Sequence, residues 1–581
     1  MALACPAIFL TLAAISPTRA EMVGLSPDPV PQMLSQAGPA LPRLPSQPIP
    51  EPPLPDQPLP PLPPPEELLP PAEPALPEAP LEGTEATFFV STIEITGSTV
   101  FSQADWADLV APYLNRQVSF GELLELRNAI TERYVTAGYI TSGAILPPQT
   151  LVDDRVTLQA IEGELEEIVV VGSNRLSPAY VRSRLGLAST PPLNVDQLLA
   201  GLQRLQLNPL IETVAADLQA GSGANLSVLV VELAEADSFA VDLSLDSYGA
   251  ASTGAGQRRV LLSQGNLSGL GDRITLEYEN TDGSNGVDLS YTLPVSPNND
   301  ALRIRAGYSS SRVIDPNFQV LDISSSSVYY DLGYRHALIE TPTEALTLGL
   351  TLSHQQNQTR LGLDNIGPFP LSPGADREGI TRVTALRFSQ QWTQRSQTHV
   401  LAFRSQFSLG LDWPNATVNP TGPDSRFLAW RGQGQWLQRF GPDTVLLLRG
   451  DAQLASNDLL SPEKFGLGGA QSGRGYGRDV LLRDSGGLLS AELRSPIARV
   501  PELDATLQLI PFLDVGVAWN VNADLASGPN TLIGTGLGLL WQQGDRLSMR
   551  VDLGIPLVPV AEGRNGLQES GISYSVRYML F

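Results

Sequence analysis

From about residue 237 to residue 581, the chain alternates apolar and polar residues with a period of two. In one such run, Leu547, Met549, Val551, Leu553 and Ile555 are separated by Ser548, Arg550, Asp552 and Gly554. Strands of roughly nine to eleven residues with one apolar face and one polar face are what a bilayer-spanning barrel requires. At roughly twenty residues for each strand and its connection, the region predicts a membrane β-barrel of about sixteen antiparallel strands.

A large soluble β-sandwich or β-propeller is the alternative interpretation, because its strands alternate as well. The inward positions here include Arg, Asp and Glu in numbers that a close-packed core could not bury unpaired. No repeat that could mark propeller blades is visible in the sequence. We therefore favour the barrel, which at this size encloses an aqueous channel unless something fills it.

Charge and cysteine content exclude several function classes. Lys and Arg number 37 against 61 Asp and Glu, a net charge of −24, whereas a nucleic-acid partner needs a basic surface. The one cysteine, Cys5, lies in an apolar stretch that predicts an export signal over residues 1–20. The mature chain then has neither a disulfide nor a thiolate site. Beyond residue 20 no apolar run of about eighteen residues predicts a membrane helix.

Residues 21–85 are dominated by proline, most densely at Pro61 and at 63–65, and carry several glutamates. Proline cannot donate to a hydrogen-bonded ladder and favours extended conformations. We expect this segment to be a disordered linker, a semi-rigid spacer without a fold of its own.

Two copies of one small architecture follow the linker. In residues 86–163, a strand (88–95), two helices (103–113 and 120–137) and two strands (140–146 and 155–163) are expected. Residues 164–236 repeat the order with a strand at 168–171, helices at 178–185 and 195–206, and strands at 211–219 and 226–233. Helix limits follow from caps such as Ser119 with Glu122, and Asn194. The repeat predicts two α+β modules of order β-α-α-β-β.

Nothing in the sequence predicts an enzyme. His336, His354 and His399 are the only histidines and lack the paired spacing of metal ligands. No nucleophile elbow accompanies a plausible base. We expect no catalytic residue, no metal and no cofactor.

A glycine-rich segment at 466–480 interrupts the alternation and contains Gly473, Arg474, Gly475 and Tyr476. About forty residues later, Phe512, Asp514 and Gly516 share one face of a predicted strand, opposite an apolar face. If the apolar face touches lipid, Asp514 faces the lumen beside the small Gly516, where an incoming guanidinium could pair with it. A flexible extracellular loop is the alternative for 466–480.

At these residues the chain resembles the two-partner secretion transporters of Gram-negative outer membranes, the haemolysin secretion and filamentous-haemagglutinin transporter family. The lumen-loop motif of that family matches Arg474, Gly475 and Tyr476, with Gly473 in place of the usual Val. The barrel-wall motif matches Phe512, Asp514 and Gly516. The resemblance extends over nearly all the chain after the linker, as two POTRA-like modules (86–163 and 164–236) followed by the barrel (237–581).

The resemblance implies a pore in the outer membrane with its N-terminal modules in the periplasm. It implies that these modules recognise a large unfolded exoprotein, which passes through the barrel to the cell surface. The other expected partners are outer-membrane lipid and the barrel-assembly machinery that inserts the chain, which we expect to be a monomer. An assembly factor of the same superfamily, which inserts other outer-membrane proteins, is the alternative function. A diffusion porin would need no POTRA modules.

Overall fold

The computed structural model describes residues 63–69, 87–441, 444–522, 529–560 and 566–580. The predicted export signal lies outside the described residues, as does the predicted linker apart from 63–69. Within the described part of the chain, no helix has both the length and the apolar character needed to cross a bilayer.

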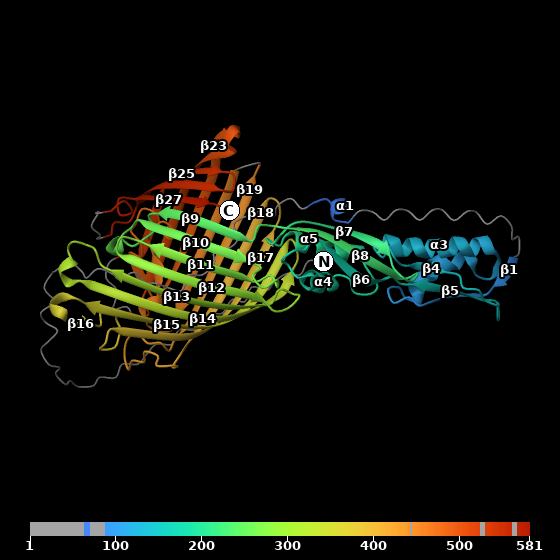
Figure 1. Cartoon of the computed structure of the whole chain (residues 1–581), viewed down its shortest axis with the longest axis horizontal. Coiled ribbons are helices and arrows are strands. Elements are labelled where there is room, and N and C mark those ends of the chain that lie inside the picture. Colours follow the sequence, from blue (N-terminus) through green and yellow to red (C-terminus); the bar gives the residue numbers. More distant parts are fainter. Residues whose placement is uncertain (1–62, 70–86, 442–443, 523–528, 561–565, 581) are drawn as a thin grey trace, which may run out of the picture. The chain divides into compact units, whose positions relative to one another are not determined.

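Sixteen of the described strands form one closed antiparallel ring, in which the last strand pairs with the first (Figure 1). In chain order they are β9 (Phe239–Asp246), β10 (Gln257–Gly265), β11 (Arg273–Asn280), β12 (Ser284–Pro294), β13 (Ala301–Arg312), β14 (Ile323–Glu340), β15 (Glu344–Leu361), β17 (Ile380–Arg395), β18 (His399–Leu411), β19 (Leu428–Phe440), β20 (Thr444–Ala455), β23 (Ser485–Val500), β24 (Ala505–Trp519), β25 (Thr531–Gln543), β26 (Leu547–Pro556) and β27 (Ile572–Met579). The two-residue β16 (Gly367–Pro368) is an addition to β15. The predicted fold class and strand number are confirmed.

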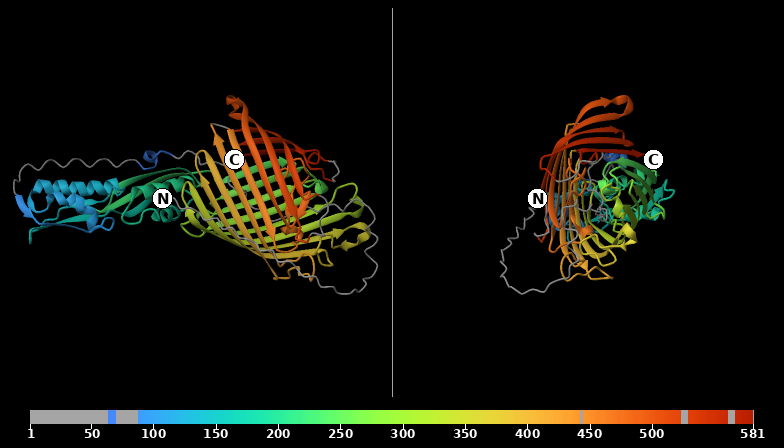
Figure 2. Two further views of the ribbon diagram at one scale, coloured as in Figure 1. Left: turned by 180° about the vertical axis from the view of Figure 1, so that it is seen from behind. Right: turned by 90° about the vertical axis from the view of Figure 1, so that its left-hand side faces the viewer.

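The strand register places apolar residues of neighbouring strands together on the outer face. Leu276 of β11 pairs with Leu289 of β12, which pairs with Ala306 of β13. The leucine side chains are 42% and 43% exposed, as expected of groups that face lipid. Successive side chains of a strand point to opposite faces of the sheet. The residues that alternate with these leucines along β11 and β12 therefore face the lumen. Figure 2 shows the same strands from two further sides.

Several ionic groups on the lumen side form ion pairs. Arg305 lies 3.4 Å from an oxygen of Asp288 and 3.6 Å from an oxygen of Asp331, on the two adjacent strands. The Arg305 guanidinium also donates to the hydroxyl of Tyr329 at 3.1 Å. This pairing explains how a barrel wall holds charges that an apolar core could not hold.

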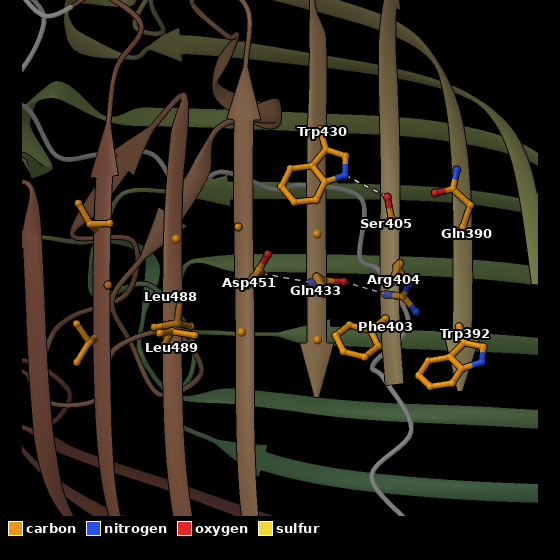
Figure 3. Close-up of a pocket in the computed structure, with 18 of the residues that line it drawn as sticks. Gln390, Trp392, Phe403, Arg404, Ser405, Trp430, Gln433, Asp451, Leu488 and Leu489 are labelled. Atoms are coloured by element: carbon orange, nitrogen blue, oxygen red, sulfur yellow. Dashed lines mark hydrogen bonds between the residues drawn. The ribbon is translucent and has the colours of Figure 1, made fainter. Parts of the chain in front are cut away.

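The wall formed by β18 to β25 shows the difference between the two faces most clearly (Figure 3). A groove of about 720 Å³ is lined by residues of both faces of this wall and of the adjacent β17, outward ones such as Trp392 and Phe403 and inward ones such as Arg404 and Asp451. The indole of Trp430 lies over Gly432, where an added Cβ would meet the ring at 2.5 Å. On the inner face of the same strands, Arg404 donates to Gln433, which donates to Asp451. Aromatic rings therefore cover the outer backbone, and a hydrogen-bonded chain covers the inner one.

The first module contains β1 (Thr87–Val90), β2 (Thr92–Thr96), η2 (Gln103–Trp106), α2 (Ala107–Val110), η3 (Ala111–Tyr113), β3 (Arg116–Ser119), α3 (Phe120–Thr136), β4 (Gly143–Ile145) and β5 (Arg155–Ile161). One expected strand, 88–95, is divided at Ser91, whose amide donates to the carbonyl of Asp154. The chain thereby leaves β3 and pairs in parallel with β5. The expected helix at 103–113 is broken into short turns, and Pro112 lacks the amide that a continuous helix needs.

The second module contains β6 (Glu164–Val171), α4 (Pro178–Gly186), α5 (Val195–Gln206), β7 (Ile211–Ala220) and β8 (Leu226–Glu235). Its sheet has the order β6-β8-β7, and β7 and β8 are antiparallel. Asn194 caps α5 as expected by accepting from the amides of Asp196 and Gln197. The same side chain donates to the carbonyl of Ala137 at the end of α3, so one residue joins the two modules.

Part of the predicted linker belongs to the second module. Residues Pro65–Leu68 form the short helix α1, and the side chain of Leu68 is fully buried in the core with Leu198 and Leu202 of α5. Burial of a leucine contributes about 1.5–3 kcal/mol of transfer free energy. Residues 63–69 are therefore a docked segment and not a plain spacer.

The Glu162 carboxylate joins several parts of the first module by accepting five hydrogen bonds. The donors are the amides of Thr99 and Val100 and the hydroxyls of Ser98, Thr99 and Tyr134. Burial by itself would raise the pKa of Glu162, but these hydrogen bonds outweigh it and the pKa is lowered. Burial is the main cause that raises the pKa of Tyr134 to about 12, so this hydroxyl remains a donor at neutral pH.

We predict that Glu162→Gln destabilises the first module at pH 7 and that the difference from wild type shrinks in acid. A carboxyl group with a lowered folded pKa contributes stability above its unfolded pKa of about 4.3. That contribution is lost as the pH falls through the folded pKa. Urea unfolding of residues 87–163, followed by the fluorescence of Trp106, measures the effect. An equal difference at pH 7 and pH 3 would contradict it.

Candidate functional site: a loop bound to the inner barrel wall

The connection between β20 and β23 turns into the barrel and folds against its inner wall. Two short strands, β21 (Phe465–Leu467) and β22 (Leu481–Arg483), pair to form the base of this lumen loop. An apolar cluster attaches the loop to the wall. Its buried members are Phe465, Leu467, Tyr476, Val480 and Leu481 of the loop with Ala518 and Leu532 of the wall. The interpretation of 466–480 as a free extracellular loop is wrong, because residues 473–477 at its tip are buried.

At the tip of the loop, Arg474 contacts the wall residue Asp514. The Arg474 Nε donates to Asp514 Oδ2 at 2.7 Å, and Nη2 donates to Oδ1 at 2.5 Å. The backbone amide of Arg474 donates to the same Oδ2 at 3.0 Å. Both side chains are 4% exposed. This two-pronged geometry is the one in which arginine binds a carboxylate most strongly.

A second carboxylate binds the other side of the same guanidinium. Arg474 Nη1 donates to Glu492 Oε1 at 2.7 Å, and Nη2 also reaches the hydroxyl of Ser490 at 3.2 Å. Ser490 in turn donates to Asp514 Oδ1 at 2.7 Å. Every nitrogen of the guanidinium therefore has an acceptor, as a buried cation requires.

Glu492 extends the site to a third wall strand. Arg550 of β26 lies 3.2 Å from Glu492 and 2.7 Å from Asp552. Arg494 lies 3.4 Å from Glu492 on its own strand. The loop cation thus enters a network already present on the wall, formed by β23, β24 and β26. Removing one partner of such a buried pair costs about 3–5 kcal/mol, because it leaves an uncompensated charge.

Phe512 and Tyr476 hold the tip by other means. The Arg474 guanidinium lies 3.7 Å from the centre of the Phe512 ring, a cation–π contact. The Tyr476 hydroxyl lies 2.9 Å from the carbonyl of Ile533 and 3.0 Å from that of Val558, and it accepts from both of their amides. The Tyr476 hydroxyl therefore binds main-chain groups of the wall and not the side chains of residues 533 and 558.

Small residues on the wall make the close approach possible. A Cβ added at Gly534 of β25 would lie 2.0 Å from the carbonyl oxygen of Arg474. One added at Gly554 of β26 would lie 2.4 Å from the amide nitrogen of Gly475. Gly475 itself has φ +97°, a conformation that glycine adopts without strain. Gly516, which we expected to leave space for Arg474, instead leaves space for Leu467.

The structure brings together nearly all the residues proposed from the sequence. Gly473, Arg474, Gly475 and Tyr476 form the tip, and the Gly473 amide closes the turn by donating to Gly469. Phe512 and Asp514 face it. Sequence reasoning missed Glu492 and Gly534. A lumen-facing glutamate near the middle of a strand was the available signal for the first, and alternating glycines at 534, 536 and 538 were the signal for the second.

The three histidines lie on separate strands. His336 contacts Asp300, His354 contacts Thr384 and His399 contacts Ser396. Among the residues that the structure describes, no group of three His, Cys, Asp or Glu side chains is arranged to hold a metal ion.

Comparison with known proteins gives consistent matches over most of the chain. The family model described as Haemolysin secretion/activation protein ShlB/FhaC/HecB matches residues 225–540, and the POTRA domain, ShlB-type, matches residues 88–163. Outer membrane transporter CdiB of Escherichia coli O6:K15:H31 (strain 536 / UPEC) is 25% identical over 494 residues, 82% of this chain and 80% of that protein.

Two further matches agree. Heme/hemopexin transporter protein HuxB of Haemophilus influenzae (strain ATCC 51907 / DSM 11121 / KW20 / Rd) is 26% identical over 401 residues, 67% of this chain and 68% of that protein. The solved structure of CdiB from Escherichia coli has a TM-score of 0.64 at 22% identity, covering 87% of this chain and 93% of that one. This last likeness is one of fold.

A sixteen-stranded barrel preceded by POTRA modules, together with these matches, defines the chain as an outer-membrane transporter. Within that class, this chain belongs to the ShlB/FhaC/HecB family of haemolysin secretion and activation proteins. It is a two-partner secretion transporter of the outer membrane that secretes an exoprotein, and it is not an enzyme.

We predict that Gly534→Ala displaces the loop tip and increases the conductance of the purified barrel in planar bilayers. The added methyl group would meet main chain, which cannot rotate away. Gly487→Ala on β23 is the matched control, since the nearest atom to its Cβ is 3.8 Å away. Equal conductance of both variants would show that the wall tolerates a larger residue at 534.

Proposed function

We propose that the barrel carries a large unfolded exoprotein from the periplasm to the cell surface, and that the contact of Arg474 with Asp514 and Glu492 holds the lumen loop inside the pore between transport events. The burial of all three ionic side chains supports this proposal, because a loop that merely rested in a water-filled lumen would leave them solvated. A chain that passes through must move this loop or go around it.

We assign recognition of the exoprotein, the client of this transporter, to the POTRA modules. In the second module β7 is an edge strand, ten residues long, that pairs only with β8 among the described strands. An edge strand offers its amides and carbonyls to an incoming extended chain, main chain to main chain. Binding of this kind tolerates a long and varied client sequence. The client's own folding outside the cell then prevents its return.

The function is tested by deleting the gene and comparing the secreted proteome with the outer-membrane proteome. We expect one large exoprotein to disappear from the secreted fraction while the other barrels remain, as two-partner secretion requires. Loss of many outer-membrane barrels would instead identify an assembly factor. Loss of neither would indicate a diffusion pore.

We predict that Arg474→Ala strongly lowers secretion while the barrel stays inserted. The substitution leaves Asp514 and Glu492 buried without the loop cation, a cost of about 3–5 kcal/mol. Secreted exoprotein is measured against the amount of heat-modifiable barrel in isolated outer membranes. Arg478→Ala is the matched control, since Arg478 lies on the same loop with its side chain 35% exposed. Normal export by the Arg474 variant would remove the proposed role of the contact.

The reciprocal exchange of Arg474→Asp with Asp514→Arg should recover only part of the export. The new aspartate would face Glu492, and like charges at that distance repel. Adding Glu492→Gln removes the repulsion, so we expect the triple variant to export more than the double variant. Equal export by the double and triple variants would show that Glu492 does not act on the loop residue.

A further inference from the structure

Lys464 is the only lysine in the 581-residue sequence, beside 36 arginines. It lies immediately before β21, at the base of the lumen loop. Its ammonium group is 2.7 Å from Oδ1 of Asp484, and the two side chains are 12% and 0% exposed. Asp484 follows β22 directly. The pair therefore joins the two ends of the lumen loop.

Asp484 also binds two neighbouring connections. Its Oδ1 accepts from the amide of Leu459 and its Oδ2 accepts from the amide of Val521, each at 3.0 Å. Leu459 belongs to the connection that precedes the loop, and Val521 follows β24. One fully buried carboxylate therefore joins three segments that lie up to about sixty residues apart in the sequence.

The residue before Lys464 connects the base of the loop to two further strands of the wall. Glu463 binds Arg387 of β17 at 2.7 and 3.1 Å. Its carbonyl accepts from Gln453 of β20 at 2.8 Å, and the Gln453 amide group also donates to the carbonyl of Asp484 at 3.0 Å. The base of the loop is thus bound to β17 and β20, whereas the Arg474 side chain donates hydrogen bonds to residues of β23 and β24.

We propose that Lys464 and Asp484 form a second attachment of the lumen loop, at its base, and that this pair is a positioning device from which Arg474 reaches the wall. The paired strands β21 and β22 transmit the position of the base to the tip. Phe465 and Leu467 of β21 lie against Gly486 of β23 and Gly516 of β24, so a shift of the base moves the whole hairpin.

A single lysine permits a direct test on the purified full-length barrel. In the wild type we expect an amine-reactive ester to label Lys464 far more slowly than the terminal amine, as peptide mapping of the labelled chain would show. In Asp484→Asn, which keeps the shape of the side chain and removes its charge, labelling of Lys464 should rise about tenfold or more. Rapid labelling of the wild type would overturn the proposal.

The positioning role is tested by hydrogen exchange of the peptide that contains residues 468–480. In Lys464→Met, which removes the ammonium group and keeps the length, these amides should exchange about tenfold faster or more. Lys464→Arg should restore slow exchange, because it keeps the charge. Unchanged exchange in Lys464→Met would show that the pair serves only the local fold, which would overturn the role.

A measurement of secretion tests whether the attachment matters for function. Of the three experiments, only this one rests on the proposed function. We expect Lys464→Met to reduce export several-fold while the amount of inserted, heat-modifiable barrel is unchanged. Arg312→Met is the matched control, because Arg312 pairs with Asp322 at 3.1 Å on the surface with side chains 68% and 47% exposed. Faster exchange with normal export would count against the proposed function of the loop and leave the attachment standing. Slow exchange with reduced export would overturn the attachment.

Discussion

A bilayer offers no water to unpaired backbone groups, and this constraint governs the whole of the barrel. Each strand must pair on both sides, which only a closed ring achieves. The pairing of β27 with β9 satisfies that demand. Closure then fixes two faces, and the alternation of side chains follows from it. Sixteen strands enclose more space than their own side chains can fill, so the lumen holds water wherever no other part of the chain occupies it.

The lumen loop fills part of that space by ionic contacts that remain specific in a wet interior. Arg474 brings a cation to a wall that already carries Glu492 and Asp514, and the network includes the guanidinium of Arg550. Glycine backbones on β25 and β26 let the tip approach main chain to main chain. Moving the loop away would leave buried carboxylates without their cation, which costs free energy. The loop is therefore stabilised in one bound position. The separate pair of Lys464 and Asp484 fixes the other end of the loop.

Much of the fold could be predicted because its signals are periodic. The alternation over residues 237–581 determines a barrel and its strand number, and helix caps such as Ser119 and Asn194 determine where helices begin. Local chemistry could not reveal that Ser91 divides a strand, because the partner is a carbonyl more than sixty residues away. The burial of Leu68 was hidden for a related reason. A proline-rich context predicts an extended spacer, and only the folded core of the second module gives this leucine a buried place.

The sequence by itself determined which residues could form the site, since a glycine-flanked arginine and a lumen-facing aspartate are visible as residue types at a fixed spacing. Only the tertiary structure decided how many partners the arginine has. Strand pairing places Ser490 beside Asp514, and Glu492 lies one side-chain period further along the same face, whereas nothing in a linear pattern states which inward residues become neighbours across strands. The same holds for Gly534 and for the pair of Lys464 and Asp484. Their function depends on contacts between separate segments of the chain, and such contacts are defined only by the folded structure.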